Sequence, residues 1–181
     1  MANALTTLRL LLVAPFIVCM ARGDNRSAVI ALAIWTVALA TDIFDGPIAR
    51  RRGTVSAMSR AFDHTSDFLF VTGGITAGAW RGDIPWVLPV FITAAFIQYV
   101  IDSRWMQPKS GLRGNKLGRY NGMLYFLPPC ADALTRVGAV FLRPVLTALV
   151  WLLVLSTIAS MIQRLSYWRL SEHLSRSTPQ K

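Results

Sequence analysis

The chain is short of acidic residues, cysteines and histidines. Its 181 residues include nine Asp and Glu against nineteen Lys and Arg, with two Cys and two His, and the formal net charge is +10. Cys19 and Cys130 do not form a metal-binding cysteine pattern. Both lie in apolar segments, where a buried thiol acts as a small hydrophobic side chain. We see no internal repeat, no low-complexity run and no second domain.

Apolar residues are abundant instead. They make up 54% of the chain, and the mean hydropathy of +0.45 is too high for an ordinary soluble domain. Apolar runs cover residues 5–21, 27–42, 56–79, 84–106, 117–137 and 142–162. Each is near the roughly 17–25 residues that cross a hydrocarbon core. The first run contains Arg9 and is followed by no small-residue cleavage site, which argues against a signal peptide.

These runs predict an all-α integral membrane bundle of six transmembrane helices. The membrane domain would span residues 1–163. A basic tail, residues 164–181, would lie on the membrane surface or fray.

The basic residues are distributed unevenly among the loops between the runs. If the amino terminus is cytoplasmic, the inner segments hold Arg50, Arg51, Arg52, Arg104, Lys109, Arg113, Lys116, Arg119, Arg164, Arg169, Arg176 and Lys181. The outer loops hold Arg22, Arg26, Arg81, Arg136 and Arg143. This bias predicts that both termini are cytoplasmic. It also explains the positive net charge without nucleic acid, and a basic inner rim suits anionic lipids.

Four of the nine acids lie between residues 42 and 67. Asp42 and Asp45 are three residues apart, and Asp63 and Asp67 are four apart. On helices each pair would project from one face. Acids at a membrane boundary are costly without a compensating cation and therefore indicate a functional site. Four carboxylates in one small volume form an oxygen-only ligand set that suits a hard divalent cation.

The spacing around these acids resembles the signature of the CDP-alcohol phosphotransferase family. That signature is Asp, two residues, Asp-Gly, two residues, Ala-Arg, eight residues, Gly, three residues, Asp, three residues, Asp. The chain matches with Asp42, Asp45, Gly46, Ala49, Arg50, Asp63 and Asp67, and Ser59 replaces the second glycine. The start of the chain is similar to the first helix of the phosphatidyltransferase members, of the phosphatidylglycerophosphate synthase type, through Asn3, Leu5, Thr6, Arg9 and Pro15.

The resemblance implies an enzyme that moves a phosphatidyl group from CDP-diacylglycerol to an alcohol and releases CMP. It implies that Asp42, Asp45, Asp63 and Asp67 hold Mg²⁺ or Mn²⁺, as two ions, and that Asp67 accepts the proton of the acceptor hydroxyl. Two such cations stabilise both the attacking and the leaving oxygen. The family also suggests a homodimer whose lipid substrate lies between helices in the bilayer.

The same resemblance assigns the nucleotide site to Gly46, Ala49, Arg50 and Ser59. Gly46 allows close approach, Ala49 leaves room, and the planar fork of Arg50 suits phosphate. Ser59 would either add a hydrogen bond to the nucleotide or narrow the pocket. His64 projects to another face than the two neighbouring acids, and we interpret it as a packing residue.

The acceptor is not determined by the sequence. If it is a phosphorylated alcohol, its phosphate needs cations, and the candidates are Arg104, Arg113, Lys116 and Arg119. The alternative interpretation is a cytoplasmic loop that follows the charge bias. We favour glycerol 3-phosphate, with inositol phosphate, phosphatidylglycerol and serine left open. Asp102 is expected to pair with Arg104 or Lys116, and Asp132 with Arg136.

Two other function classes fit parts of the pattern. A divalent-cation transporter would place acids near mid-membrane on several helices, whereas these acids lie near one cytoplasmic end. A non-catalytic member of the family is supported by Ser59 alone.

Overall fold

The computed structural model describes the backbone of residues 2–52, 57–105 and 116–177, and the side chains of residues 6–41, 62–102 and 117–166. The described elements are α1 (Ala2–Ala21), α2 (Asn25–Arg52), α3 (Ala57–Arg81), α4 (Val87–Trp105), α5 (Lys116–Leu124), α6 (Leu127–Arg136), the short 3₁₀ helix η1 (Val140–Leu142) and α7 (Arg143–Ser177). The described part of the chain contains helices and short connections but no strand, which confirms the all-α prediction.

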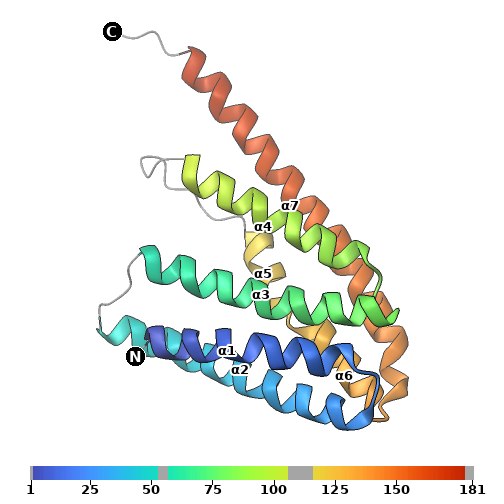
Figure 1. The fold of residues 1–181 in the computed structure, drawn as a ribbon. Coiled ribbons are helices and arrows are strands. Elements are labelled where there is room, and N and C mark those ends of the chain that lie inside the picture. The colour runs from blue at the N-terminus through green and yellow to red at the C-terminus, as the bar shows by residue number, and fades with distance from the viewer. Residues whose placement is uncertain (1, 53–56, 106–115, 178–181) are drawn as a thin grey trace.

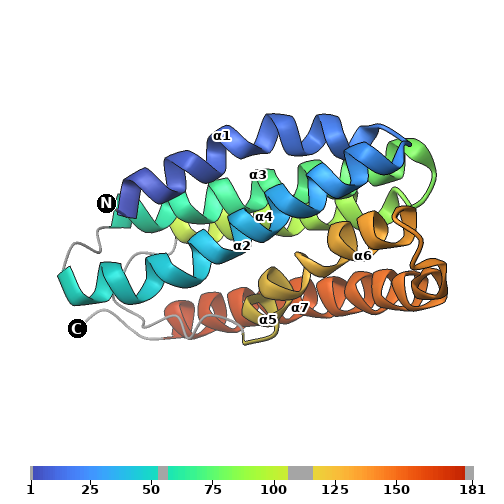
Figure 2. The ribbon, with the colours of Figure 1, turned by 90° about the horizontal axis from the view of Figure 1, so that it is seen from below.

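Successive helices run in alternating directions along one bundle, with α5 and α6 following each other in a single pass (Figures 1 and 2). The start of α1 and the end of α7 therefore lie at the same end of the bundle. The first half of α3 and the last parts of α2 and α4 also lie toward this end, which we call the aspartate end (Figure 2). The helices draw together at the opposite end, where the α1–α2 and α3–α4 connections lie.

The six predicted spans are only partly matched by apolar helices. Among the described residues, one helical segment, Val140–Ser166, is long and apolar enough to cross a membrane, with a hydropathy of 2.3. Only 33% of the apolar 18-residue stretch within this segment is buried, whereas a core helix of a soluble protein would be mostly buried. Three shorter apolar helices cover Thr6–Ala21, Asn25–Thr41 and Val87–Asp102.

The apolar runs and the helices end at different residues. Helix α2 continues beyond residue 42 through Pro47 to Arg52, so Pro47 does not end it. An apolar run ends where polar side chains begin, but a helix ends only where its backbone hydrogen bonds stop. In the same way α7 extends past residue 162 to Ser177.

The fifth predicted span is divided into α5 and α6. Pro128 and Pro129 open α6 and lack the amide hydrogens that a continuous helix would need there. The Trp35 indole N–H of α2 donates to the carbonyl of Phe126 at the break, at 2.9 Å. Pro-induced breaks persist when neighbouring helices satisfy the exposed backbone in this way.

Helix α1 packs closely against α3 because α3 presents two glycines. A Cβ atom on Gly73 would lie 2.4 Å from Ile17 Cδ1, and one on Gly74 would lie 2.5 Å from Phe16 Cε1. The Phe16 ring stacks on Phe70 with centroids 4.2 Å apart. Small residues let helix backbones approach in this manner, and the close approach brings the polar residues of α1 within reach of α3.

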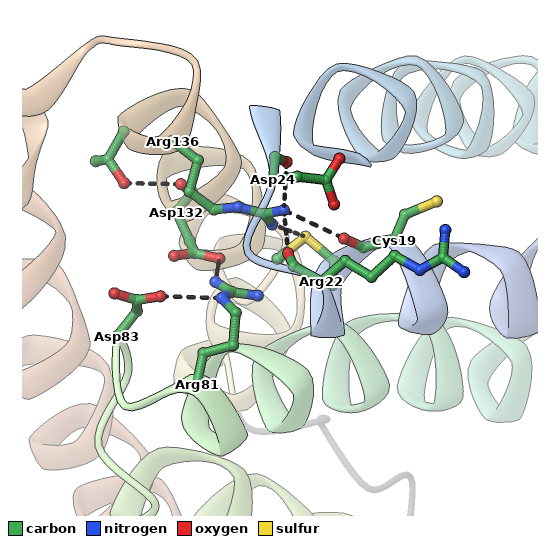
Figure 3. Close-up of polar contacts among 9 residues, drawn as sticks. Cys19, Arg22, Asp24, Arg81, Asp83, Asp132 and Arg136 are labelled. Atoms are coloured by element: carbon green, nitrogen blue, oxygen red, sulfur yellow. Dashed lines mark hydrogen bonds and ion pairs between the residues drawn. The ribbon is translucent and has the colours of Figure 1, made fainter. Parts of the chain in front are cut away.

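Ion pairs and hydrogen bonds of two arginines join α1, α3 and α6 at the end opposite the aspartates (Figure 3). Arg81 at the end of α3 donates to Asp83, at 3.0 Å, and to the buried Asp132 of α6. The predicted pairing of Asp132 with Arg136 is therefore wrong. The Arg136 guanidinium instead donates to the carbonyls of Cys19, Arg22 and Asp24, because the unpaired carbonyls at the end of a helix attract a cation.

Asp24 caps the start of α2. Its carboxylate accepts hydrogen bonds from the backbone N–H and the hydroxyl of Ser27, each at 2.8 Å. These bonds, the backbone one first, lower the pKa of the exposed Asp24 carboxyl below its ordinary value. The cap is thus retained at neutral pH, and its contribution to stability is lost as the pH falls through the lowered pKa.

Candidate active site at the aspartate end

Asp63 and Asp67 lie one turn apart on α3, as their spacing predicts. Both side chains are partly open to solvent, with 36% and 24% of their surface exposed. Both carboxylates reach the same nitrogen atom, Nη1 of Arg9 on α1. The two acids therefore converge on one point between α1 and α3.

Arg9 is fully buried although it carries a charge. Its Nη1 lies 3.2 Å from Asp63 Oδ1 and also donates to Asp67 Oδ1. The Thr6 hydroxyl, one turn earlier on α1, donates to the same oxygen of Asp63 at 3.4 Å. Arg9 and Thr6 thus form one wall of the acidic site.

The sequence analysis gave neither of these residues a role in the site. A signal was available, because an arginine inside an apolar helix needs a carboxylate partner. Thr6 and Arg9 are also three residues apart and therefore share a helix face. The spacing alone does not say which carboxylate the arginine would reach.

The other predicted site residues lie mainly outside the described side chains. Asp42, Asp45, Gly46, Ala49 and Arg50 are on the last part of α2, and Ser59 is in the first turn of α3. Of these the structure describes the backbone alone. Among the described residues no group of three His, Cys, Asp or Glu side chains comes together, so the four-aspartate set remains a prediction.

A basic residue that the sequence analysis left in the tail lies within the bundle. Arg164 of α7 is 23% exposed and lies 3.8 Å from Asp102 of α4. Its guanidinium also lies over the Tyr99 ring, 5.4 Å from the ring centre, which is within the range of a cation–π contact. Asp102 thus has a partner on α7, whereas the expected partners Arg104 and Lys116 lie outside the described side chains.

Helix α5 accommodates Arg164 by presenting a glycine. A Cβ atom on Gly118 would lie 3.1 Å from Arg164 Nη2 and 3.1 Å from Ser160 Oγ. Of the four predicted acceptor-phosphate residues, Arg119 is exposed on α5, and Arg104, Arg113 and Lys116 are outside the described side chains.

The Tyr99 ring of α4 lies between Arg164 of α7 and helix α3, which carries Asp63 and Asp67. Tyr99 contacts Arg164 on one side, and its ring meets the His64 ring edge to face with centroids 6.0 Å apart. His64 directly follows Asp63 on α3 and is exposed. The ring contact agrees with the packing role expected for His64. It also places Arg164 on the side of α3 that faces α4.

The described carboxylates fit a hard divalent cation. Asp63 and Asp67 supply oxygen donors, converge on one nitrogen atom of Arg9 and keep part of their surface open. Oxygen ligands of this kind bind Mg²⁺ or Mn²⁺ rather than metals that prefer sulfur or imidazole. One fixed guanidinium also leaves the pair with excess negative charge.

The chain belongs to the CDP-alcohol phosphatidyltransferase family. The family model with that description matches residues 1–128, which include α1 to α5, the four aspartates and the Thr6–Arg9 turn. Arg164 lies beyond the matched segment.

Two similar proteins are known by name. Each is called "Probable phosphatidylglycerophosphate synthase", one from Mycobacterium tuberculosis strain CDC 1551 / Oshkosh and the other from strain ATCC 25618 / H37Rv. Each is 33% identical over 95 residues, which cover 51% of this chain and 46% of the relative. The chain thus matches these relatives over about half the length of each protein.

Proposed function

We propose that the chain transfers a phosphatidyl group from CDP-diacylglycerol to an alcohol and releases CMP. The observation that carries this proposal is the convergence of Asp63 and Asp67 on one point at the aspartate end, in a chain whose family signature is complete except at Ser59. The family match supports the class of reaction.

The reaction requires a nucleophile, a leaving group and a proton acceptor. The acceptor hydroxyl oxygen attacks the phosphorus that carries the diacylglycerol, a new P–O bond forms, and the bond to the bridging oxygen of CMP breaks. We assign the hydroxyl proton to Asp67, the less exposed of the two described aspartates. Such proton transfer accounts for a factor of about 10²–10⁴ in rate.

Asp42, Asp45, Asp63 and Asp67 would hold two Mg²⁺ or Mn²⁺ ions. When bound, these ions would supply charge neutralisation for the pyrophosphate of the donor. The protein itself then contributes mainly alignment and electrostatic stabilisation.

The nucleotide part of the donor would lie along the end of α2 and the first turn of α3. We assign Gly46, Ala49, Arg50 and Ser59 to it, as the signature implies. Ser59 is the position at which this chain departs from the family.

The acceptor we propose is glycerol 3-phosphate. Its phosphate would be bound by cations, and Arg164 joins Arg104, Arg113, Lys116 and Arg119 as a candidate. The name of the similar mycobacterial proteins agrees with this acceptor. Inositol phosphate, phosphatidylglycerol and serine are the alternatives that the experiment below includes.

We further propose that the bundle crosses the membrane six times, as a homodimer, with the aspartate end in the cytoplasm. The alternating helix directions (Figure 2), the apolar exposed surface of α7 and the charge bias of the loops support the crossings and the orientation. The homodimer rests on the family resemblance alone. The acyl chains of the donor would then lie beside the helices while its headgroup reaches the aspartates.

The test is CMP release by the purified protein in detergent with CDP-diacylglycerol, Mg²⁺ or Mn²⁺, and each of the four acceptors. We expect release with glycerol 3-phosphate and a loss of roughly 10²-fold or more in Asp67→Asn. Asp83→Asn is the matched control, because it removes a carboxylate at the other end of α3, and it should retain activity.

Release with a different acceptor would correct the substrate and keep the class. If no acceptor supports release, CMP binding is compared between the parent protein and Ser59→Gly to test whether the nucleotide pocket is open. Binding by Ser59→Gly alone would show a nucleotide pocket closed by the serine, and the proposed activity would be wrong for this chain.

A further inference from the structure

Arg9 is a fully buried charged residue beside the two described carboxylates of the signature. It comes from an apolar helix, it is fully buried, and two of the groups that it contacts are carboxylates of the signature. A buried charge is tolerated only when it is paired and hydrogen-bonded. Asp63 and Asp67 thus allow Arg9 to be buried. The two carboxylates in turn depend on the positive charge of Arg9.

Two carboxylates one helical turn apart repel each other. Nη1 of Arg9 contacts Oδ1 of both and so places a positive charge between them on the side that faces α1. The exposed fractions of Asp63 and Asp67 show that the pair is still partly open to solvent. The guanidinium therefore offsets part of the charge of the pair without closing the site.

We propose that Arg9 is the internal counter-cation of the aspartate site. It balances Asp63 and Asp67 when no divalent cation is bound, and a bound cation takes over most of this role. The part played by a bound cation rests on the proposed function, whereas the role of Arg9 in the metal-free protein does not.

Arg81 provides a matched control within the same helix. It also pairs with two carboxylates, Asp83 and Asp132, but at the opposite end of α3 (Figure 3). Arg81→Gln removes a similar amount of ion pairing without touching the aspartates of the signature. The carboxylates that lose their partner differ in position and in burial. Arg9→Gln affects Asp63 and Asp67, which are partly exposed, whereas Arg81→Gln affects the buried Asp132.

The experiment measures the unfolding temperature in detergent, with EDTA and with saturating Mn²⁺. In EDTA we expect Arg81→Gln to unfold roughly 6 °C or more below the parent protein, because it leaves the buried Asp132 without its partner. Arg9→Gln should also unfold below the parent protein, but by a smaller amount, because Asp63 and Asp67 are partly exposed to solvent. Mn²⁺ should recover most of the loss in Arg9→Gln and none of the loss in Arg81→Gln. Arg9→Lys, which keeps the charge, should lose less than Arg9→Gln in EDTA.

The Mn²⁺ dissociation constant gives a second and independent measurement, by electron paramagnetic resonance of free Mn²⁺. Removing a positive charge beside the site should strengthen the attraction for a divalent cation, so Arg9→Gln should bind Mn²⁺ roughly tenfold more tightly than the parent protein. An arginine that only orients the aspartates predicts the opposite, a loss of about 10-fold to 100-fold. Weaker binding would therefore overturn the counter-cation role.

If Arg9→Gln does not fold, the double variant Arg9→Gln with Asp67→Asn decides. Removing one carboxylate charge should restore folding in EDTA if Arg9 is a counter-cation. Failure of the double variant to fold would overturn the inference. If Mn²⁺ neither binds nor stabilises the parent protein, the proposed function fails, whereas the comparison of Arg9→Gln with Arg9→Lys in EDTA still tests the metal-free role.

Discussion

Arg164 shows how one charged side chain is held inside an apolar helix bundle. Its helix, α7, contains the described segment that is long and apolar enough to cross a membrane, yet the guanidinium lies between Asp102, the Tyr99 ring and the position of Gly118. The 3.8 Å separation from Asp102 is at the long limit for an ion pair, and the side chain is 23% exposed. It is therefore held in place but not fully neutralised, which suits a residue that binds an anionic ligand.

At the residue scale we predict that Arg164→Gln weakens binding of the acceptor and leaves binding of the donor unchanged. Loss of a hydrogen bond to a charged group should raise the KM for glycerol 3-phosphate about 10-fold to 100-fold. The measurement is CMP release with each substrate varied in turn. Arg143→Gln, at an exposed arginine of the same helix at the opposite end, serves as the control. Equal changes in both KM values would contradict the assignment.

At the scale of the elements, the site depends on how closely α1 approaches α3. Gly73 and Gly74 leave no space for a Cβ atom against Ile17 and Phe16. This contact lies near the end of α1, about two turns beyond Arg9, and it sets how closely the two helices approach each other. A core position of this kind resists added volume because Phe16 already stacks on Phe70.

We predict that Gly74→Ala destabilises the protein by about 1–3 kcal/mol, as expected for overpacking. The added methyl group would push Phe16 and separate the two helices, so the loss should be larger than at an open glycine. Gly23→Ala is the control, since a Cβ atom there meets nothing within 4 Å. The measurement is thermal unfolding of both variants in the same detergent. Equal unfolding temperatures would contradict the prediction and show that α1 and α3 accommodate the added methyl group.

The whole molecule places the proposed site at one end of the bundle. The alternating helix directions bring the last part of α2, the first part of α3 and the end of α4 together at the aspartate end (Figure 2). The opposite end is held by ion pairs of Arg81 and by the contacts of Arg136 with α1. Both ends therefore contain charge pairs, and at the aspartate end both carboxylates paired with Arg9 remain partly exposed.

This arrangement predicts a membrane topology. In a background with Cys19 and Cys130 replaced by alanine, Gly23→Cys should react with a membrane-impermeant maleimide on intact cells. Ser171→Cys, on the last part of α7, should react only after the membrane is opened. The reverse pattern would invert the proposed orientation, and labelling of both positions on intact cells would contradict an odd number of crossings between them.

The sequence by itself determined the helical class and the spacing of the acids. Both follow from local chemistry, because apolar runs favour helices in a low-dielectric environment and a spacing of four places Asp63 and Asp67 on one face. It did not determine where helices end, as α2 and the α5–α6 break show, since backbone hydrogen bonds continue past apolar boundaries and stop inside apolar runs.

Only the tertiary structure decided which charged residues meet. Arg9 reaches Asp63 and Asp67 across 54 and 58 residues of sequence, and Arg81 reaches Asp132 across 51. A pattern along the chain reports which residues share a face of their own helix. The partner of that face is set by how helices pack, which here depends on Gly73 and Gly74 between α1 and α3 and on Gly118 beside Arg164.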